Sequence, residues 1–460
     1  MALIIAGERS GVGKTTIALA LNAALRAWGE SVQVFKVGPD YIDPMFHSRI
    51  SGQPCRNLDP ILTSPAYVQA CFQSHCQGAT YSLIEGVMGL FDGRGGTQAG
   101  STADIARILN LPILLVIDAQ KLAGSVAAIA QGFVQFDPKL TIAGLILNRV
   151  GSDRHQAILQ TALEPLDIPI VGWLRREDAI QLHHRHLGLI PLGEMSDFNA
   201  LGDRLAHLGQ TCFDWSILRP LLADSKSSSS LPTGEPLPEN NLPQKTPRVS
   251  LAIAQDEAFN FYYADNLDLL TALGTTLVPW SPIRDTHLPP NIGGLYFGGG
   301  FPEVFAPDLS ENESARRAVA QAIQKGMPTY AECGGLMYLS EAIIPEAGKS
   351  YPMVGVLPTQ AHMGQRLTLG YRHVTAIQPS PLVPLETRLW GHEFHYSRLT
   401  PEPDCPLWHI DEDNHNPLPS AHEGWFSPTL HASYIHLHWG THPDLLARFL
   451  GKIYSYRLLP

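Results

Sequence analysis

The first segment with recognisable chemistry is a glycine-rich turn between an apolar stretch and a helical pattern. Residues 7–16 read GERSGVGKTT and follow the apolar residues 2–5. Backbone N–H groups in such a turn, with the positive end of the following helix, form an anion site. Lys14 would reach the terminal phosphates of a nucleotide, and the Thr15 hydroxyl would ligate Mg²⁺. We therefore expect this loop to bind ATP through Gly11, Gly13, Lys14, Thr15 and Thr16.

Acidic residues follow three further apolar stretches, in KVGPDYIDP (36–44), in EGVMGLFDG (85–93) and at Asp118. In an open α/β sheet, ligands bind beyond the carboxyl ends of the strands. Carboxylates there would repel phosphates unless Mg²⁺ intervenes, so we expect Asp43 and Glu85 to hold the metal with Thr15. For Asp118, a helix cap or turn is an equal alternative. Asn148 is a candidate for the adenine edge, although an ordinary turn position explains it nearly as well.

A cysteine is the candidate nucleophile. Cys333 lies in PTYAECGGLMY (328–338), between a predicted strand and a predicted helix. The glycines permit the strained turn that exposes a nucleophile, and a helix N-terminus lowers the pKa of a thiol. Backbone N–H groups near Gly334 and near Gly300, in the turn GGGFPE, are candidates for an oxyanion hole. A lone cysteine is more often a buried packing residue, but these glycines favour catalysis.

Two histidines supply candidate bases for the thiol. The segment ASYIHLHWG (432–440) predicts a strand with His436 and His438 at alternate positions. Side chains two residues apart on a strand point to the same face, so both histidines are expected to face Cys333.

Parallel strands must position these residues. Short apolar stretches, each followed by turn residues and a helical pattern, indicate a buried parallel sheet at 2–5, 31–37, 82–84, 113–117 and 142–147. The same pattern of apolar stretch, turn residues and helical pattern recurs at 249–254, 276–279, 294–297 and 327–330. We therefore expect an α/β protein of two doubly wound domains. The segments 368–374 and 386–390 indicate additional β structure in the second domain.

A segment of different composition separates the two domains. It is rich in Ser, Pro and Asn and has almost no large apolar side chain to bury. The sequence therefore predicts a first, nucleotide-binding domain at 1–222, a flexible linker at 223–247 and a second domain at 248–460. An ordered surface loop is the alternative for the linker.

Net charge, the length of the apolar stretches and the cysteine count argue against several classes of protein. The 460 residues carry a net charge of −11 without a Lys/Arg cluster, which argues against binding to nucleic acid or an anionic membrane. The apolar stretches are shorter than the ~20 residues that span a bilayer. Six cysteines without a C-x-x-C pair are too few for a disulfide scaffold. We expect a cytoplasmic protein with small-molecule partners, and the sequence leaves a homodimer open.

Several long motifs resemble the cobyrinate a,c-diamide synthase family. They are KVGPDYIDPMFH, NLD (57–59), EGVMGLFDG, AFNFYYADNLDLL, GGGFPE and AECGGLMYL. The resemblance covers nearly the whole chain except the linker, and the long glycine loop is typical of dethiobiotin-synthetase-like domains. It implies a ligase of cobalamin biosynthesis that uses ATP, Mg²⁺ and glutamine to amidate the a and c acetate chains of cobyrinate.

The resemblance also implies residue roles in a glutamine amidotransferase domain. Cys333 would form a glutamyl thioester, and His436, at the family's Y-x-H position, would activate it. Many class I glutaminases carry a glutamate two residues later, where this chain has His438, so we expect a Cys–His dyad. His438, Gly300 and Gly334 are possible supporting residues. The activated carboxylate and the metal would be lined by Asp40, Tyr41, Asp43, Glu85 and Asp92.

Two kinds of alternative remain. A sibling enzyme would amidate hydrogenobyrinate or nickel-sirohydrochlorin, or convert cobyrinic a,c-diamide to cobyric acid. The string KVGPDYIDPMFH favours the a,c-diamide group but does not reveal the ring or its metal. A partition-type regulatory ATPase is a more distant alternative, and Cys333 argues against it because such ATPases normally lack a thiol domain.

Overall fold

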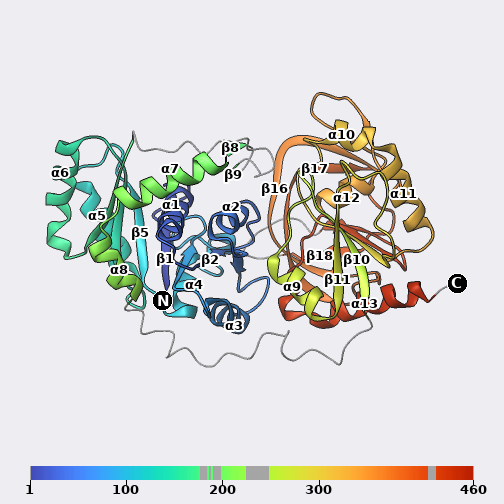
Figure 1. The fold of residues 1–460 in the computed structure, drawn as a ribbon, viewed down its shortest axis with the longest axis horizontal. Helices are drawn as coiled ribbons and strands as arrows, with labels where there is room; N and C mark the ends of the chain where they lie inside the picture. The colour runs from blue at the N-terminus through green and yellow to red at the C-terminus, as the bar shows by residue number, and fades with distance from the viewer. Residues whose placement is uncertain are drawn as a thin grey trace. The chain divides into compact units, whose positions relative to one another are not determined.

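The computed structural model describes residues 2–176, 198–223, 248–412 and 421–458, with the backbone of 184–185 and 188–189. The chain divides into two compact units (Figure 1), and each is described by itself. The first is Met1–Pro60 with Ser64–Glu235, and the second is Pro236–Pro460 with Ile61–Thr63. The predicted linker lies outside the described residues except for Ala223, so its flexibility stays a prediction.

The first unit holds a parallel sheet. Among the described residues it has seven strands in the order β3-β2-β4-β1-β5-β6-β7. Their bounds are β1 Ala2–Gly7, β2 Val32–Val37, β3 Arg56–Leu58, β4 Tyr81–Glu85, β5 Ile113–Asp118, β6 Ile142–Val150 and β7 Ile170–Arg175. β1 pairs with β4 on one side and with β5 on the other. The chain therefore extends the sheet in opposite directions from β1, and this switch point lies at the carboxyl end of β1. Such a switch point is where open α/β sheets bind ligands.

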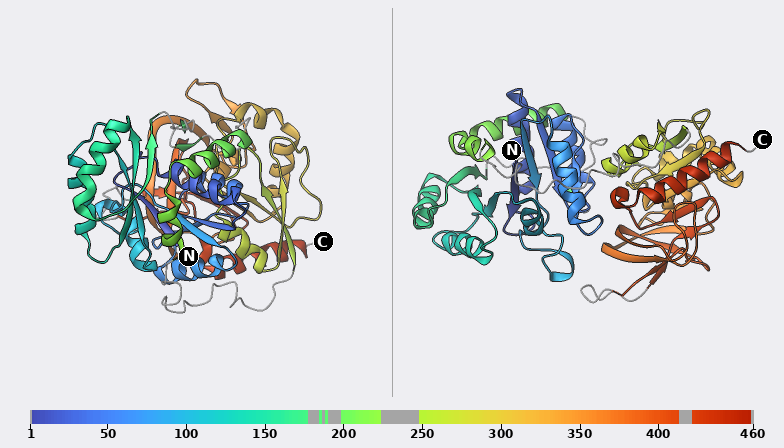
Figure 2. Two further views of the ribbon diagram at one scale, coloured as in Figure 1. Left: turned by 60° about the vertical axis from the view of Figure 1, so that its left-hand side comes forward. Right: turned by 90° about the horizontal axis from the view of Figure 1, so that it is seen from below.

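Helices lie on both faces of this sheet (Figure 2). They are α1 Lys14–Ala27, α2 Ile42–Ser51, α3 Pro65–Cys76, α4 Thr102–Leu109, α5 Ser125–Phe136, α6 Asp153–Leu163, α7 Phe198–Thr211 and α8 Trp215–Ala223. Short 3₁₀ turns occur at Arg94–Gly96 and Glu164–Leu166, and His184–Arg185 pairs with Gly188–Leu189. With both faces covered, the central strands are buried throughout, which explains their continuous apolar sequences.

The second unit contains two sheets. The first has the order β11-β10-β12-β13-β21-β20, parallel except for β20. Its bounds are β10 Val249–Ala254, β11 Thr275–Trp280, β12 Gly294–Phe297, β13 Thr329–Glu332, β20 Trp425–Phe426 and β21 Leu430–Ser433. The second sheet has the order β15-β14-β16-β18-β19, with β17 paired to β16. Its bounds are β14 Ala342–Ile344, β15 Tyr351–Pro352, β16 Gln360–Ala376, β17 Arg388–Thr400, β18 Trp408–Ile410 and β19 Ala421–Glu423.

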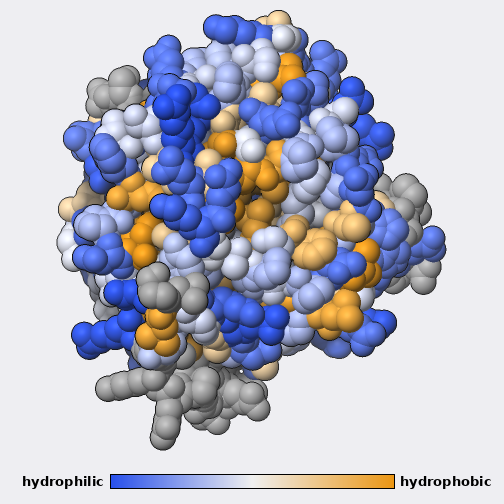
Figure 3. Space-filling view, turned by 90° about the vertical axis from the view of Figure 1, so that its right-hand side faces the viewer, coloured by the Kyte–Doolittle hydropathy of each residue, from blue (hydrophilic) through white to orange (hydrophobic). Residues whose placement is uncertain are grey.

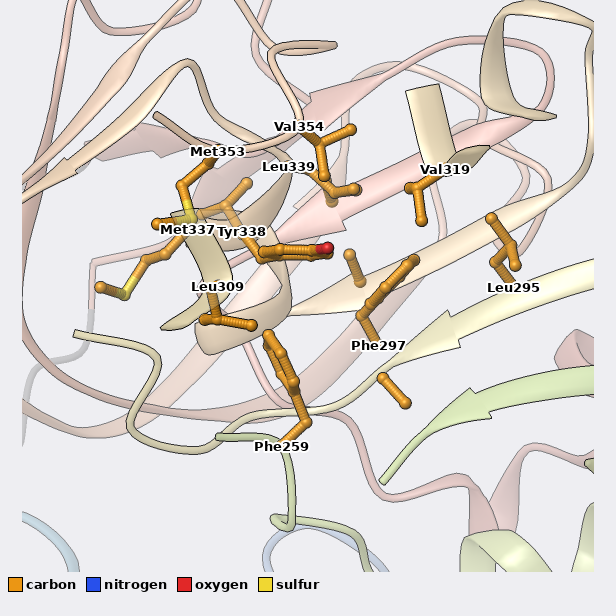
Figure 4. Packing of buried hydrophobic residues seen from close by; sticks show 14 of the residues in the cluster. Phe259, Leu295, Phe297, Leu309, Val319, Met337, Tyr338, Leu339, Met353 and Val354 are labelled. Atoms are coloured by element: carbon orange, nitrogen blue, oxygen red, sulfur yellow. The ribbon is translucent and has the colours of Figure 1, made fainter. Parts of the chain in front are cut away.

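Alternation along the strands explains how the parallel sheet of the second unit is covered. Leu295 and Phe297 of β12 pack with Val319 and Tyr338 in one apolar cluster (Figure 4). Tyr296, between them, belongs to the cluster on the opposite face, as the two-residue period of a strand requires. The helices of this unit are α9 Ala264–Ala272, α10 Ala306–Glu311, α11 Glu313–Gln324, α12 Gly334–Leu339 and α13 Pro443–Arg457, with a 3₁₀ turn at Trp439–Thr441.

The predicted α/β fold is confirmed, with differences in detail. The stretch 327–330 was expected to be a strand, but β13 begins two residues later, at Thr329. The short strand β3 and the strand β7 were not predicted. The β-rich segments 368–374 and 386–390 belong to the long pair β16 and β17.

The surface of the second unit is mixed in character. On the face drawn in Figure 3, polar side chains surround separate apolar patches, which is ordinary for a protein surface. No helix within the described residues is both long and apolar enough to cross a membrane.

The contact between α1 and α7 gives a test of the packing in the first unit (Figure 1). A Cβ on Gly209 would lie 2.1 Å from the Ala20 carbonyl oxygen, whereas nothing lies within 4 Å of a Cβ on Gly202 in the same helix. We predict that Gly209→Ala lowers the free energy of unfolding by roughly 1–3 kcal/mol. Gly202→Ala should raise it by about 0.5–1 kcal/mol. Urea denaturation measures both changes, and equal effects would contradict this packing.

Candidate functional site

The glycine-rich loop after β1 has the backbone of an anion site. α1 begins at Lys14, directly after Gly13, whose φ is 98°. A Cβ at that position would lie 2.3 Å from Asn148 Nδ2, so both the conformation and the close approach require glycine. Asn148 Nδ2 donates to the Val12 carbonyl oxygen at 2.7 Å. Asn148 therefore braces the loop from β6, a role that the sequence did not indicate.

Lys14 is buried against the loops at the end of β1. Its Nζ donates to the Met88 carbonyl oxygen at 2.5 Å and to the Arg9 carbonyl oxygen at 3.3 Å. Burial, and then the nearby Lys36, lowers the pKa of Lys14 to about 8. Backbone carbonyls thus hold an ammonium group next to the position where phosphates would bind.

The structure brings together Thr15, Asp43 and Glu85, as predicted, around a lysine that was not assigned to the site. The Thr15 hydroxyl donates to Glu85 Oε1 at 2.6 Å and lies 3.3 Å from Asp43 Oδ2. Lys36 Nζ lies 2.7 Å from Asp43 Oδ2 and 2.8 Å from Glu85 Oε1. The other Glu85 oxygen, Oε2, lies 2.6 Å from His47 Nε2. The position of Lys36 inside the apolar strand VQVFKV is the sequence signal that could have placed it in this site, because a buried ammonium needs a carboxylate partner.

Burial and charge act in opposite directions on these carboxylates. Burial raises the pKa of Asp43 well above its ordinary value, and Asp40 adds to this. Burial also disfavours ionisation of Glu85, but Lys36 and His47 hold the pKa of Glu85 well below its usual range. Of the two carboxylates, Glu85 therefore has the lower pKa.

The donor set fits Mg²⁺. The Thr15 hydroxyl oxygen, Asp43 Oδ2 and Glu85 Oε1 are hard oxygen donors that meet at one point. Within the described part of the chain, no three His, Cys, Asp or Glu side chains form a metal cluster. Mg²⁺ usually takes one or two carboxylates and completes its shell with water and substrate phosphates, and here it would share Asp43 Oδ2 and Glu85 Oε1 with Lys36 Nζ.

The other predicted residues of this unit shape the surrounding loops. Asp40 Oδ1 accepts the N–H groups of Ile42 and Asp43, at 2.8 and 3.1 Å, where α2 begins. Tyr41, beside it, is buried. Asp92 Oδ2 accepts the Gly89 N–H at 2.9 Å and closes the loop after β4.

Asp118, at the end of β5, pairs with two arginines. Its Oδ2 lies 2.8 Å from Arg9 Nη2 and 2.7 Å from Arg149 Nη1. Arg149 Nη2 also donates to the Gly11 carbonyl oxygen at 3.1 Å. Asp118 therefore links the phosphate loop to β5. Its Oδ1 accepts the Gln120 N–H at 2.9 Å in a turn, which is the alternative that the sequence left open for Asp118.

In the second unit, Cys333 occupies the strained turn that its glycines predicted. Its φ is 44°, and it directly precedes α12. The thiol is buried and donates to the Phe394 carbonyl oxygen at 3.5 Å. Burial, followed by the charge of Glu303, raises the pKa of the Cys333 thiol, while the Gly334 N–H lowers it less. The expectation of a depressed thiol pKa was therefore wrong, because α12 spans only six residues and desolvation dominates.

The predicted oxyanion-hole glycines approach this turn. Gly300 has a φ of 154°, and a Cβ there would lie 2.0 Å from the Ala258 carbonyl oxygen. A Cβ on Gly334 would lie 3.1 Å from the Gly300 nitrogen, and one on Gly299 would lie 2.6 Å from His436 Cε1. The glycine turn, the residue after the thiol and the His436 ring therefore converge at one place.

The two histidines do not lie on one strand. β21 ends at Ser433, and the His436 backbone then pairs with His392 in an isolated bridge. His438 Nδ1 accepts the Gly440 N–H at 3.2 Å, and its Nε2 lies 3.6 Å from Asp265 Oδ2. The prediction that both face the thiol from one strand face was wrong, because the chain leaves the sheet before reaching them. His436 Nδ1 instead lies 3.5 Å from Glu332 Oε2, a residue that the sequence did not single out.

Comparison with known proteins agrees with these two centres. Residues 3–189 match the CobQ/CobB/MinD/ParA nucleotide binding domain family, and residues 250–444 match the CobB/CobQ-like glutamine amidotransferase domain family. The chain is 58% identical over 451 residues to a cobyrinate a,c-diamide synthase from Synechococcus sp., with 98% of each chain covered. It is 51% identical over 466 residues to one from Synechocystis sp., with 99% of this chain and 94% of the relative covered. A hydrogenobyrinate a,c-diamide synthase from Streptomyces coelicolor is 39% identical over 482 residues, with 98% and 97% covered.

Removing the ammonium between the two carboxylates should destabilise the first unit. We predict that Lys36→Met, in nucleotide-free and metal-free buffer, lowers the free energy of unfolding by about 3–5 kcal/mol, because it leaves buried charge without its partner. Lys139→Met, at an exposed position of the same unit, should change it by less than about 0.5 kcal/mol. Chemical denaturation compares the two, and equal stability of both variants would contradict the buried ion pairs.

The raised pKa of Cys333 predicts slow alkylation of the free enzyme. A thiol whose pKa is raised carries little thiolate at neutral pH, and its reaction rate increases as the pH rises. Cys405 is exposed, so iodoacetamide should label it first at neutral pH, as measured by peptide mass spectrometry. Labelling of Cys333 at neutral pH as fast as Cys405, without glutamine present, would contradict the protonated buried thiol.

Proposed function

Since this chain belongs to the cobyrinate a,c-diamide synthase family, we propose that it amidates the a and c carboxylates of cobyrinate with ATP and glutamine. The observation that carries this proposal is one chain holding both a phosphate loop, with Lys14 at the start of α1, and a buried thiol turn at Cys333. Free cysteines throughout the chain are in keeping with a reducing, cytoplasmic setting.

The first unit would activate the carboxylate. A carboxylate is a poor acyl donor because oxide is a poor leaving group. An oxygen of the corrin carboxylate attacks the γ-phosphorus of ATP, the bond to the bridging oxygen breaks, and acyl phosphate and ADP form. Gly11, Gly13, Lys14 and Thr16 would bind the phosphates. The ammonium of Lys14 offsets the negative charge that develops on them.

Metal binding in this unit is assigned to oxygen donors in the first turns of α1 and α2 and at the end of β4. Thr15, Asp43 and Glu85 would hold Mg²⁺, which when bound neutralises phosphate charge and orients the γ-phosphoryl group. Asp40, Tyr41 and Asp92 would shape the carboxylate pocket beside them. Support comes from their positions around the loops that carry Asp43 and Met88.

The second unit would release ammonia. His436 takes the Cys333 proton, and the thiolate attacks the side-chain amide carbon of glutamine. N–H groups near Gly300 and Gly334 stabilise the resulting oxyanion. The intermediate expels ammonia after His436 returns the proton, and water then hydrolyses the thioester to glutamate and the free thiol. The ammonia attacks the acyl phosphate, and phosphate leaves as the amide forms.

Product analysis of three proteins tests this proposal. With ATP, Mg²⁺, glutamine and cobyrinate, the native enzyme should give the diamide by mass spectrometry. Cys333→Ala should lose glutamine-dependent amidation by at least about 10³-fold yet retain activity with ammonium salts. Lys14→Ala should lose activity with both nitrogen sources, because the activation step is shared.

Two results would contradict the proposal. One is glutamine-dependent product from Cys333→Ala when ammonium salts fail. The other is hydrolysis of glutamine by the native enzyme with no amide on cobyrinate. A parallel reaction with hydrogenobyrinate tests which ring is the substrate. If the diamide forms faster from hydrogenobyrinate than from cobyrinate, the chain is a hydrogenobyrinate a,c-diamide synthase instead.

A further inference from the structure

The imidazole of His436 is sealed from water, and its two edges face different parts of the second unit. The residue is 1% exposed. A Cβ built on Gly299 would lie 2.6 Å from its Cε1 and 3.4 Å from its Nε2. That edge borders the glycine turn that also approaches Gly334, the residue after Cys333. Nε2 is therefore the nitrogen on the side of the thiol turn.

The opposite edge of the ring faces a carboxylate. Nδ1 lies 3.5 Å from Glu332 Oε2, and Glu332 is 2% exposed. His392, on β17, is a second titratable group beside His436. Burial, followed by His436 and Arg372, lowers the pKa of His392 to about 3, so it stays neutral. Glu332 is thus an acidic group that lies against His436.

Glu332 is held in place independently of the histidine. Its Oε1 accepts the Leu437 N–H at 3.1 Å and the Tyr330 hydroxyl. Both bonds fall on Oε1, which leaves Oε2 directed to the ring. Glu332 is also the last residue of β13 and the chain neighbour of Cys333. A carboxylate locked by two hydrogen bonds on a central strand is a pre-organised support for a catalytic group.

The position that carries a carboxylate in many related glutaminases has a different role here. His438 stands two residues after His436, and its ring caps the 3₁₀ turn and lies near Asp265. A carboxylate for His436 must therefore come from another element, and β13 supplies one.

We infer that Glu332 is the positioning residue of His436, so that two consecutive residues, Glu332 and Cys333, serve the two sides of one imidazole. This inference rests on the glutamine hydrolysis proposed above. Glu332 keeps the proton on Nδ1, so Nε2 can accept the thiol proton, and it stabilises the imidazolium that forms with the thiolate. The two atoms are 3.5 Å apart, and catalytic hydrogen bonds often shorten once substrate binds.

Glu332→Gln tests this role, because the amide oxygen still accepts the Leu437 N–H while the charge is lost. The kcat for glutamate release should fall by about 10²–10⁴-fold, with amidation from ammonium salts retained. Glu332→Asp should recover part of the loss. Asp265→Asn, which removes a buried acid beside His438 instead, is the matched control and should stay near the native rate.

The tautomer of His436 gives a second measurement on the native enzyme. Nitrogen-15 NMR of labelled histidines, assigned by the signal lost in His436→Gln, should show the proton on Nδ1. A proton on Nε2, native-like glutamate release by Glu332→Gln, or equal loss of its ammonium-dependent activity would each overturn the role of Glu332. Cys333→Ala distinguishes failure of the Glu332 role from failure of the proposed function. Glutamine hydrolysis that persists in that variant would reject the thiol mechanism itself.

Discussion

Charges removed from water must find partners inside the protein, and both chemical centres of this chain are built around that constraint. In the first unit, Lys36 lies between Asp43 and Glu85 at the carboxyl ends of β2 and β4. In the second, His436 lies against Glu332 where β13 ends. A buried ion pair adds little stability compared with apolar residues of the same size. We therefore explain these clusters by the chemistry at the strand ends, where fixed charges are in place before substrates bind.

Much of the fold could be predicted because local sequence determines it. Apolar stretches such as Ile113–Asp118 have the length and β-branched content of buried strands. Gly13 has the positive φ that its loop needs, and a Cβ on Gly335, beside Cys333, would lie 2.5 Å from Phe297 Cβ. The grouping of Thr15, Asp43 and Glu85 also followed from the sequence, because the carboxyl ends of parallel strands meet at one edge.

The parts that could not be predicted depend on contacts between distant residues. Lys36 and Glu85 are 49 residues apart and become cross-strand neighbours only through the register of β2 and β4, which no local pattern specifies. The partner of His436 comes from β13, and its identity depends on where the chain leaves β21 after Ser433. The direction of the Cys333 pKa shift depends on burial by the surrounding unit, whereas the sequence shows only the glycines and the short helix that follow.

The central claim is that nitrogen removed from glutamine by a buried thiol reaches a carboxylate activated by ATP. The most direct measurement supplies glutamine labelled with nitrogen-15 in its side-chain amide, together with cobyrinate, ATP, Mg²⁺ and a limited amount of unlabelled ammonium. Mass spectrometry of the product should show nitrogen-15 in both the a and c amides. A diamide that carries only unlabelled nitrogen, or labelled ammonia released without any amide on the corrin ring, would contradict the account.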